Sequence, residues 1–185
     1  LEQQLQQANQ QSHQLRHEIE QLKQQRLLDP LTGLYNRLAM QNQLDLWFTE
    51  QPGRRIAAIA VDLDHFSRFN QDYGSAIGDV ILSKVARKVS SYVQSSGLPV
   101  RSGGEEFLIV LPNTDAEQAM AIAERLRLAI AALGFNGTSK QLSVTCSIGI
   151  SLYQADEALN ISLARADDAL YQAKAAGRNQ THYNA

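Results

Sequence analysis

The sequence predicts an α/β protein, a sandwich of the ferredoxin-like or palm type with βαββαβ order, preceded by an N-terminal coiled-coil helix. Residues 56–61 form a continuous apolar run, which is typical of a strand buried on both faces. Gly103 and Gly104 lie between two short strand-like stretches, residues 99–101 and 107–111, and this pattern indicates a hairpin. Segments with helical spacing of apolar residues alternate with these strands, as in a sheet covered by helices.

Residues 1–26 differ in composition from the rest of the chain, because they are rich in glutamine and contain neither glycine nor proline. Such a composition also occurs in disordered segments. Heptad spacing, with alternating steps of four and three residues, favours a parallel coiled coil instead, and it is carried by Leu1, Leu5, Ala8, Ser12, Leu15, Ile19 and Leu22. Because Ala8 and Ser12 weaken the apolar seam, we expect this helix to need an adjoining region to hold the pair together.

Asp29-Pro30 ends the heptad pattern, since proline lacks an amide donor and disfavours helix in the residue before it. We therefore expect residues 1–28 to form a signalling and dimerisation helix and residues 29–185 to form a separate globular domain. The first helix of that domain is expected over residues 34–48, with Gln51-Pro52-Gly53 ending it.

The first strand is followed by a loop and by a helix over about residues 77–93. Beyond the hairpin, Asp115 is expected to cap a helix that runs to residue 133, and residues 142–151 form another strand. The last helix is expected to begin at Asp156 or Asn160 and to run through residue 176. The residues that should face the core from the first two helices of the domain are Leu38, Leu44 and Trp47, and Ile81, Val85 and Val89.

Length and composition restrict the class of protein. A chain of 185 residues suffices for one well-buried domain with an appendage, and a formal net charge of −2 gives no broad attraction to nucleic acid or to an anionic membrane. We expect no nucleic-acid partner. Cys146, the single cysteine, lies in the apolar run 142–148 and is predicted to be a small buried side chain rather than a reactive thiol.

The sequence contains no run of eighteen apolar residues and no signal peptide, which predicts a soluble fragment, compatible with the cytoplasm. The chain starts at Leu1 rather than at a methionine. This start suggests an excised fragment, with an upstream sensory or membrane domain in the full-length protein; a membrane domain there would anchor the full-length protein at a membrane.

Two acidic clusters follow neighbouring strands of the predicted sheet. Asp62 and Asp64 end the buried strand, and Glu105 and Glu106 follow the two glycines directly. Acidic residues after Gly-Gly are also common in solvated turns. A carboxylate at the end of a buried strand needs a partner, however, because an unpaired buried charge is costly. A divalent cation shared between Asp62 and Glu105 would supply one, and ligands made only of oxygen suit magnesium or manganese rather than zinc.

Motifs in four segments, in the right order along the chain, resemble the GGDEF domain family, the bacterial diguanylate cyclases. The hairpin sequence Arg101-Ser-Gly-Gly-Glu-Glu-Phe107 is similar to the family signature in its Gly-Gly-Glu-Glu-Phe form. The other motifs are Asp29-Pro-Leu-Thr-Gly-Leu-Tyr-Asn-Arg37, Asp62-Leu-Asp-His-Phe66 with Asn70 and Gly78-Asp79, and Asp168-Ala-Leu-Tyr-Gln-Ala-Lys174 with Gly177-Arg-Asn179. The resemblance implies the same α/β fold and makes residues 29–185 the catalytic GGDEF domain.

The resemblance also implies an activity, the condensation of two GTP molecules into cyclic di-GMP and two pyrophosphates by a homodimer in bacterial second-messenger signalling. It implies that Asp62, the backbone carbonyl of Leu63 and Glu105 bind one or two magnesium or manganese ions. Glu106 would bind a second metal ion or satisfy nearby amides. Glu105 would in addition help to remove the proton from the attacking 3′-hydroxyl group.

The implied contacts to GTP come from six further residues. Asn70 and Asp79 would read the guanine edge, because a carboxylate accepts from N1–H and the 2-amino group while an amide both donates and accepts. The remaining contacts are to the phosphates, from the turn amides of His65 and Phe66 and from Lys174 and Arg178, which are expected to share one helical face four residues apart. Outside these motifs, Asn70 or Asp79 would be a helix cap and the two cations a solvated face.

Several positions depart from the family pattern, and they are Ser67 in place of a lysine, Gln71 in place of aspartate, Ser75 in place of histidine and Ser102 in place of tyrosine. Each departure predicts weaker activity with nucleotide binding retained. The product-inhibition motif Arg-x-x-Asp would fall on residues 94–97, which read Gln-Ser-Ser-Gly, so we expect no feedback through that site. Two alternative functions follow, a catalytically weak GTP-binding regulatory module and a coiled-coil dimerisation scaffold that binds no nucleotide.

Overall fold

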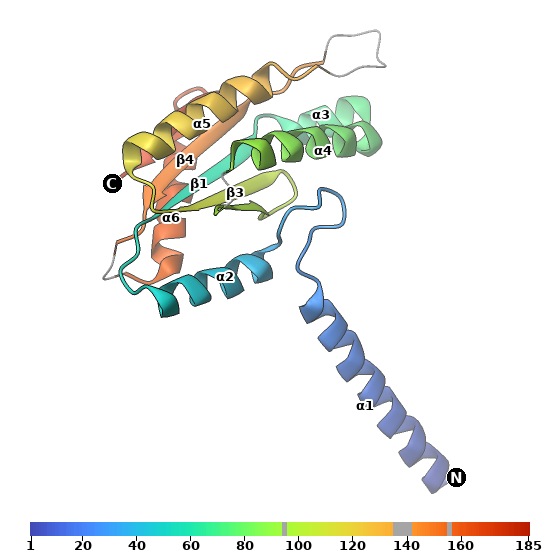
Figure 1. Ribbon diagram of the computed structural model, residues 1–185. Coiled ribbons are helices and arrows are strands. Elements are labelled where there is room, and N and C mark those ends of the chain that lie inside the picture. The colour runs from blue at the N-terminus through green and yellow to red at the C-terminus, as the bar shows by residue number, and fades with distance from the viewer. Residues whose placement is uncertain (94–95, 135–141, 155–156) are drawn as a thin grey trace.

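The computed structural model describes residues 1–93, 96–134, 142–154 and 157–185. A long helix extends from a five-stranded sheet that carries helices on both faces (Figure 1). The elements in chain order are α1 (Glu2–Gln25), α2 (Arg37–Glu50), β1 (Ile56–Leu63), α3 (Phe66–Tyr73), α4 (Ser75–Tyr92), β2 (Leu98–Arg101), β3 (Glu106–Pro112), α5 (Ala116–Ala131), β4 (Cys146–Leu152), α6 (Leu159–Ala175) and β5 (Thr181–Asn184). The predicted α/β class is confirmed, and β1 to β4 follow the predicted βαββαβ order with one additional short helix, α3, before α4.

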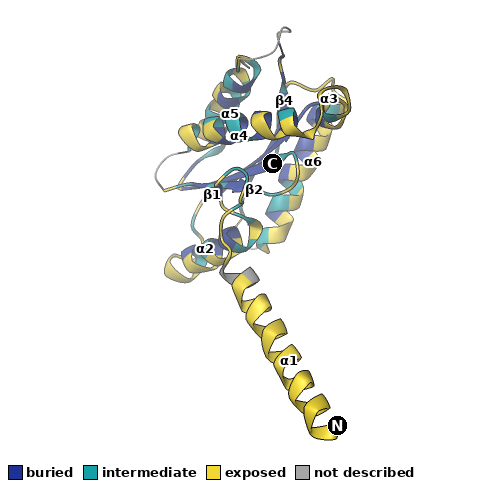
Figure 2. Cartoon of the chain, turned by 90° about the vertical axis from the view of Figure 1, so that its right-hand side faces the viewer, coloured by how far each residue is buried: buried dark blue, intermediate teal, exposed yellow. Residues whose placement is uncertain are grey.

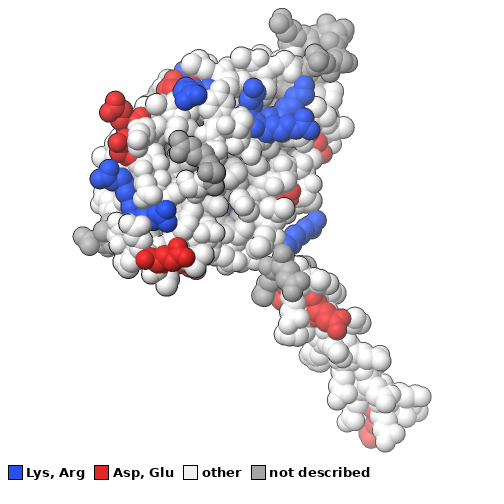
Figure 3. Space-filling model, viewed as in Figure 1, with Lys and Arg blue, Asp and Glu red and all other residues white. Residues whose placement is uncertain are grey.

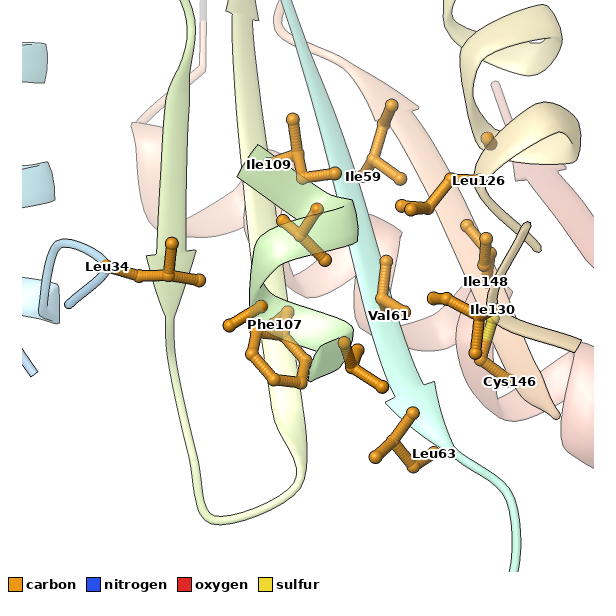
Figure 4. Close-up of a cluster of buried hydrophobic side chains, with 14 of the residues drawn as sticks. Leu34, Ile59, Val61, Leu63, Phe107, Ile109, Leu126, Ile130, Cys146 and Ile148 are labelled. Carbon is orange, nitrogen blue, oxygen red and sulfur yellow. The ribbon is translucent and has the colours of Figure 1, made fainter. Parts of the chain in front are cut away.

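The central strand β1 explains the continuous apolar run in the sequence. The strand order is β2-β3-β1-β4-β5, and β1 is antiparallel to both of its neighbours. Side chains alternate between the two faces of a strand. Ile59, Val61 and Leu63 therefore face the core under α3, α4 and α5 (Figure 4), whereas Ile56, Ala58 and Ala60 face the core under α2 and α6. Every residue of β1 is buried because helices cover both faces.

Helix α3 lies where a loop was expected, and its aromatic side chains pack against the rest of the domain. Phe66, Phe69 and Tyr73 lie on one side of this helix, and their ring centroids are 6.3 Å apart for the first pair and 4.7 Å for the second. A helix of eight residues is too short to be stable alone. Phe66 is buried in the main core, so packing against α4 and the sheet holds the helix.

Two strands differ from the prediction because of their pairing partners. β4 begins at Cys146 rather than at residue 142, since Cys146 pairs with Leu63, where β1 ends. The buried side chains of Leu142 and Val144 still contribute to the core without strand pairing. β5 was not predicted, because its four polar or half-exposed residues form a strand only by lying parallel to β4 at the sheet edge.

The ends of some helices were predicted correctly from local sequence signals, and the ends of others were not. The predicted cap at Asp115 is confirmed, and Asp115 and Gln118 form a reciprocal capping box at the start of α5. α2 begins at Arg37 rather than at residue 34, because Asn36 caps it. Its buried face is formed by Ala39, Met40, Leu44 and Trp47, whereas Leu38 is only half-buried. Ile81, Val85 and Val89 of α4 are buried as predicted.

α6 begins at Leu159, and Ala158 precedes it without a side-chain cap. Asn160 therefore lies within the first turn rather than at the start. Asp156, the alternative start, lies outside the described residues, as do Gln94 and Ser95 of the four positions at which the product-inhibition motif was sought.

Helix α1 projects from the domain with its predicted apolar stripe in solvent (Figure 2). Its side chains at Leu5, Leu15, Ile19 and Leu22 are exposed in the single chain. The segment is helical from Glu2 to Gln25, as the heptads predict, and not disordered. In the described part of the chain, no helix combines the length and apolarity needed to cross a bilayer.

On the face shown in Figure 3, lysine and arginine side chains form small separate groups with acidic groups between them. This mixture gives the face no continuous positive surface. Cys146 is buried, as predicted, and burial raises the pKa of its thiol far above the ordinary value. A thiol that stays protonated is a poor nucleophile, so Cys146 is a core residue.

Candidate active site

The end of β1 and the tip of the β2–β3 hairpin meet at one edge of the sheet. In the antiparallel register Asp62 lies opposite Glu106, and the amide of Leu63 donates to the carbonyl of Glu105 over 3.3 Å. Figure 4 shows the hairpin loop beside the end of β1. The structure thus brings together the four residues that were predicted to bind metal, Asp62, Leu63, Glu105 and Glu106.

The two oxygens of Asp62 have different surroundings. Oδ2 accepts a hydrogen bond from the Lys174 ammonium group at 2.6 Å, which forms an ion pair across the sheet edge. Oδ1 is buried and has no hydrogen-bond partner among the described residues. Most buried polar atoms in proteins have a partner, so an orphan carboxylate oxygen marks a position where a cation fits.

The neighbouring carboxyl groups resist ionisation. Burial raises the pKa of Glu105, and the charge of Asp62 raises it further, while Lys174 opposes this effect. Burial also raises the pKa of Glu106, with added contributions from Asp167 and Asp62 and an opposing one from Arg37. Mutual repulsion of this kind is relieved when a divalent cation joins the cluster. Asp167 and Arg37 were not predicted, although both lie in or next to the quoted motifs.

Within the described residues, no three acidic, histidine or cysteine side chains form a ready-made metal cage. Magnesium is commonly held by one or two carboxylates together with substrate phosphates and water. The pair of Asp62 and Glu105, with the Leu63 carbonyl nearby, matches that arrangement in its chemistry.

Asp64, the second acidic residue after β1, is fully satisfied by the protein. Its carboxylate accepts from the hydroxyl groups of Thr145 and Ser147, both at 2.6 Å, and from the amide of Asn179 at 3.0 Å. Asp64 therefore connects three segments of the domain and is not available as a ligand.

Arg101 and Arg37 hold the hairpin tip from two sides. The Arg101 guanidinium donates to the carbonyls of Gly103 and Gly104 at 3.2 and 2.8 Å, and Arg37 donates to the carbonyl of Ser102 at 2.8 Å. Arg101 also pairs with Asp29 over 3.1 Å. A Cβ atom on Gly104 would meet no protein atom within 4 Å, so the tip leaves room for a ligand to approach the backbone.

Asn70 and Asp79 lie on consecutive helices, α3 and α4. The Asn70 Oδ1 atom is buried without a hydrogen-bond partner among the described residues, and a Cβ atom on Gly78 would lie only 1.9 Å from it. Asp79 is exposed and lines a hollow of about 320 Å³. Leu31, which lies in the first quoted motif and was not predicted as a site residue, lines the same hollow. Two hollows of about 430 and 450 Å³ lie elsewhere and contain none of the predicted site residues.

The residues that were predicted to contact the phosphates differ in exposure and lie in different local structures. His65 precedes α3 in a left-handed conformation (φ 56°) and is exposed, whereas the side chain of Phe66 is buried. The prediction that Lys174 and Arg178 share a helical face was wrong, because α6 ends at Ala175. The amide of Arg178 donates to the carbonyl of Ala173, which closes the helix in a Schellman motif and leaves Arg178 beyond it.

Comparison with known proteins identifies the same family as the sequence motifs. A family model described as "Diguanylate cyclase, GGDEF domain" matches residues 26–180. Diguanylate cyclase DgcP of Pseudomonas aeruginosa is 40% identical over 164 residues, which are 88% of this chain and 24% of that protein. Response regulator PleD of Caulobacter vibrioides is 40% identical over 159 residues, 82% of this chain and 34% of that protein. The chain therefore spans only a quarter to a third of these relatives.

Solved structures show the same fold. The coiled coil and GGDEF domain of DgcB from Caulobacter crescentus, in complex with c-di-GMP, has a TM-score of 0.81 at 28% identity and covers 100% of this chain and 99% of that one. Diguanylate cyclase SiaD in complex with its activator SiaC from Pseudomonas aeruginosa has a TM-score of 0.80 at 31% identity, covering 96% and 69%. The active GGEEF domain of a Vibrio cholerae diguanylate cyclase has a TM-score of 0.66 at 30% identity, covering 78% and 87%.

Proposed function

Since the chain belongs to the GGDEF domain family of diguanylate cyclases, we propose that it condenses two GTP molecules into cyclic di-GMP and two pyrophosphates. The observation that carries this proposal is the carboxylate cluster at the end of β1, where Asp62 and Glu105 meet at the hairpin tip. The named cyclases among its relatives support it. GTP is a cytoplasmic nucleotide, so we place the domain in the cytoplasm, with a role in bacterial second-messenger signalling.

Diguanylate cyclases of this family use divalent metal ions, and we propose magnesium or manganese here. The orphan Oδ1 atom of Asp62 and an all-oxygen set of ligands fit such an ion. Asp62, the Leu63 carbonyl and Glu105 would hold it, and Glu106 would contribute to a second ion. When bound, the metal neutralises phosphate charge and makes a hydroxyl group easier to deprotonate.

The residues around the cluster would divide the remaining work. Glu105 lies beside Asp62 at the hairpin tip, and we assign it the further role of accepting the proton of the attacking 3′-hydroxyl group. Lys174 holds Oδ2 of Asp62 and orients this carboxylate. Catalysis of phosphoryl transfer depends mainly on such positioning and charge neutralisation.

Nucleotide recognition would come from both sides of the cluster. We assign the guanine edge to Asn70 and Asp79, with Leu31 offering an apolar surface to the base. The turn amides of His65 and Phe66, at the N-terminus of α3, would face phosphates because helix N-termini favour anions. Lys174 and Arg178 would complete the charge balance at the triphosphate.

The reaction requires two copies of the domain. One domain carries one set of motifs and therefore one GTP site, whereas the product contains two nucleotides. Each 3′-oxygen would form a bond to the α-phosphorus of the other GTP and displace its pyrophosphate, which needs two sites facing each other across a two-fold axis. The exposed apolar stripe of α1, which includes Leu15 and Ile19, would pair with the same stripe of a second chain.

The direct test is to incubate the purified chain with GTP and magnesium and to separate the products by chromatography. We expect cyclic di-GMP to form, and Glu105→Gln to abolish its formation while the circular dichroism spectrum stays unchanged. Product formed by Glu105→Gln near the parent rate would contradict the role of Glu105. No product from the parent would contradict the proposed activity.

A second candidate function, a weak GTP-binding regulatory module, is favoured by Ser67. This residue is exposed in the first turn of α3, where cyclases of the family usually carry a lysine. Binding of GTP in calorimetry without any turnover would support the module. Failure of GTP with magnesium to raise the melting temperature would instead support a dimerisation scaffold.

A further inference from the structure

In the turn of residues 177–179, Arg178 has a left-handed backbone conformation, which residues with a side chain rarely adopt. Arg178 and Asn179 both have left-handed φ angles, 64° and 47°, and they follow Gly177 at 120°. Two consecutive residues with side chains rarely adopt this conformation, so the surroundings must impose it.

Asn179 is held by two other parts of the domain. Its amide donates at 3.0 Å to the buried carboxylate of Asp64, the residue that directly follows β1. Its carbonyl and its side-chain Oδ1 atom accept from the Arg127 guanidinium, at 3.3 and 2.9 Å. Arg127 comes from α5 and is oriented in turn by Glu124 at 2.7 Å. Three polar groups of one residue are thus used to hold the turn.

Arg178, the residue before Asn179, has a side chain that is available to a ligand. The Arg178 side chain is exposed, and the described residues give its guanidinium no hydrogen bond or ion pair. Its backbone is nevertheless tied down, because its amide donates to Ala173 and its carbonyl accepts from Gln180 at 3.0 Å. The turn follows α6, four residues after Lys174, which contacts Asp62 in the candidate active site.

We infer that Arg127 and Asp64 are positioning residues, which lock the 177–179 turn so that Arg178 is presented to the triphosphate of the bound nucleotide. The inference rests on the proposed function, because it needs GTP as the ligand. Neither residue would touch the nucleotide, and both would act through Asn179. A locked backbone lowers the entropy that Arg178 loses when it binds phosphate, which is the general advantage of preorganisation.

A double-mutant cycle on the full-length chain tests this coupling. The variants are Arg127→Met, Arg178→Ala and both together, and Arg125→Met is the matched control, since Arg125 lies on the same helix and packs on the Tyr92 ring instead. The ligands are GMP and a GTP analogue with a methylene group between the α- and β-phosphates, which cannot release pyrophosphate. Calorimetry with magnesium measures each affinity.

We expect Arg127→Met to weaken binding of the analogue by about five- to tenfold and to leave binding of GMP unchanged. In a chain that already carries Arg178→Ala, Arg127→Met should cause no further loss of affinity. Arg127→Lys should restore part of the loss, and Arg125→Met should have no effect. An equal loss in the Arg178→Ala background, or for GMP, overturns the inference.

Amide hydrogen exchange gives a readout that does not depend on the nucleotide. The Asn179 amide should exchange faster in Arg127→Met than in the parent, and unchanged exchange overturns the lock. A parent that exchanges slowly at Asn179 but binds the analogue no better than GMP contradicts the presentation of Arg178 to a triphosphate. A parent that binds the analogue tightly but forms no cyclic di-GMP contradicts only the proposed activity.

Discussion

At the scale of single residues, the side chain of Asn70 occupies the space that a side chain at Gly78 would otherwise fill. The missing Cβ atom of Gly78 lets the Asn70 amide lie against α4 with a buried oxygen that has no described partner. Such an oxygen is available to a ligand donor, and Asp79 follows on the same helix. This geometry supports the assignment of guanine to the α3–α4 junction.

We therefore predict that the protein prefers GTP to ATP. Adenine presents an unprotonated N1 atom to Asp79, which leaves a carboxylate without its donor and should weaken binding by roughly ten- to a hundredfold. Calorimetry with the methylene-bridged analogues of both nucleotides measures the difference. Equal affinities would rule out the assignment, and Asp72→Asn, at an exposed position of α3, serves as the charge-matched control for Asp79→Asn.

Ser67 makes a second prediction at this scale. It is exposed in the first turn of α3, so a lysine would fit there without displacing other side chains. Ser67→Lys should raise kcat by roughly ten- to a hundredfold, because one added charge near the phosphates stabilises charge that develops in the transition state. KM for GTP should change little. A rate that stays the same in Ser67→Lys, with Ser67→Gln as the uncharged control, would show that the serine does not limit activity.

At the scale of elements, α6 lies so close to β4 that only glycine fits between them. A Cβ atom on Gly149 would lie 2.1 Å from the carbonyl oxygen of Ala166 and 2.2 Å from the amide nitrogen of Leu170. These are backbone atoms of a helix, which cannot rotate away as a flexible side chain can.

Gly149→Ala should therefore destabilise the domain by about 3 kcal/mol or more, because α6 must move as a whole. Urea denaturation measures the loss. Gly134→Ala is the control, since a Cβ atom there meets nothing within 4 Å, and it should change stability by about 1 kcal/mol at most. A small effect of Gly149→Ala would mean that α6 is not tightly seated.

The segment that connects α1 to the hairpin is a second point at this scale. Tyr35 bridges to Leu28 on one side and to Val100 of β2 on the other, so the segment adds to the sheet edge. Asp29 then pairs with Arg101 of the hairpin. Burial opposes ionisation of Asp29, but hydrogen bonds from Thr32 and the nearby Arg101 outweigh it and lower the pKa of the carboxyl group.

A carboxyl group whose pKa is lowered by folding stabilises the fold at pH values above its ordinary pKa. This stabilisation is lost as the pH falls through the lowered pKa. We predict that Asp29→Asn reduces stability by about 1–3 kcal/mol at pH 7. The difference from the parent should shrink below about pH 4, where the parent also becomes protonated. Denaturation curves at several pH values test this, with the exposed Asp45→Asn as the control. A difference that stays constant down to pH 2 would contradict a charge-based role for Asp29.

At the scale of the whole molecule, the proposed reaction needs two sites to meet, and the long helix would serve that requirement together with the globular domain. The stripe of α1 extends clear of the domain (Figures 1 and 2) and would bring a second domain into the millimolar range of local concentration if the linkage is short and flexible. The coil would raise the encounter rate of the domains without contacting any site residue.

We predict that specific activity rises with protein concentration and that a chain starting at Leu27 reaches the same plateau at a higher concentration. The plateau should stay unchanged because the coil contributes no residue to the site. A full-length chain with Leu15→Ser and Ile19→Ser should behave like the truncated one, which separates loss of pairing from loss of the segment. A rate that is independent of concentration in demonstrably monomeric protein would refute this prediction.

The sequence alone determined the features that local chemistry specifies. The buried strand β1, the hairpin at Gly103 and Gly104, the cap at Asp115 and the heptads of α1 all follow from spacing or residue type within one segment. The acidic clusters after β1 and at the hairpin identified the candidate site, because carboxylates at strand ends are hard to explain otherwise.

Only the tertiary structure decided where segments distant in sequence meet. α3 and β5 depend on packing and pairing partners outside themselves, and β4 begins where β1 supplies a partner. The ion pair of Lys174 with Asp62 joins residues 112 positions apart, and the turn that carries Arg178 is held from β1 and α5. Helical and strand periodicities reach only a few residues along the chain, so they contain no information about contacts over such separations.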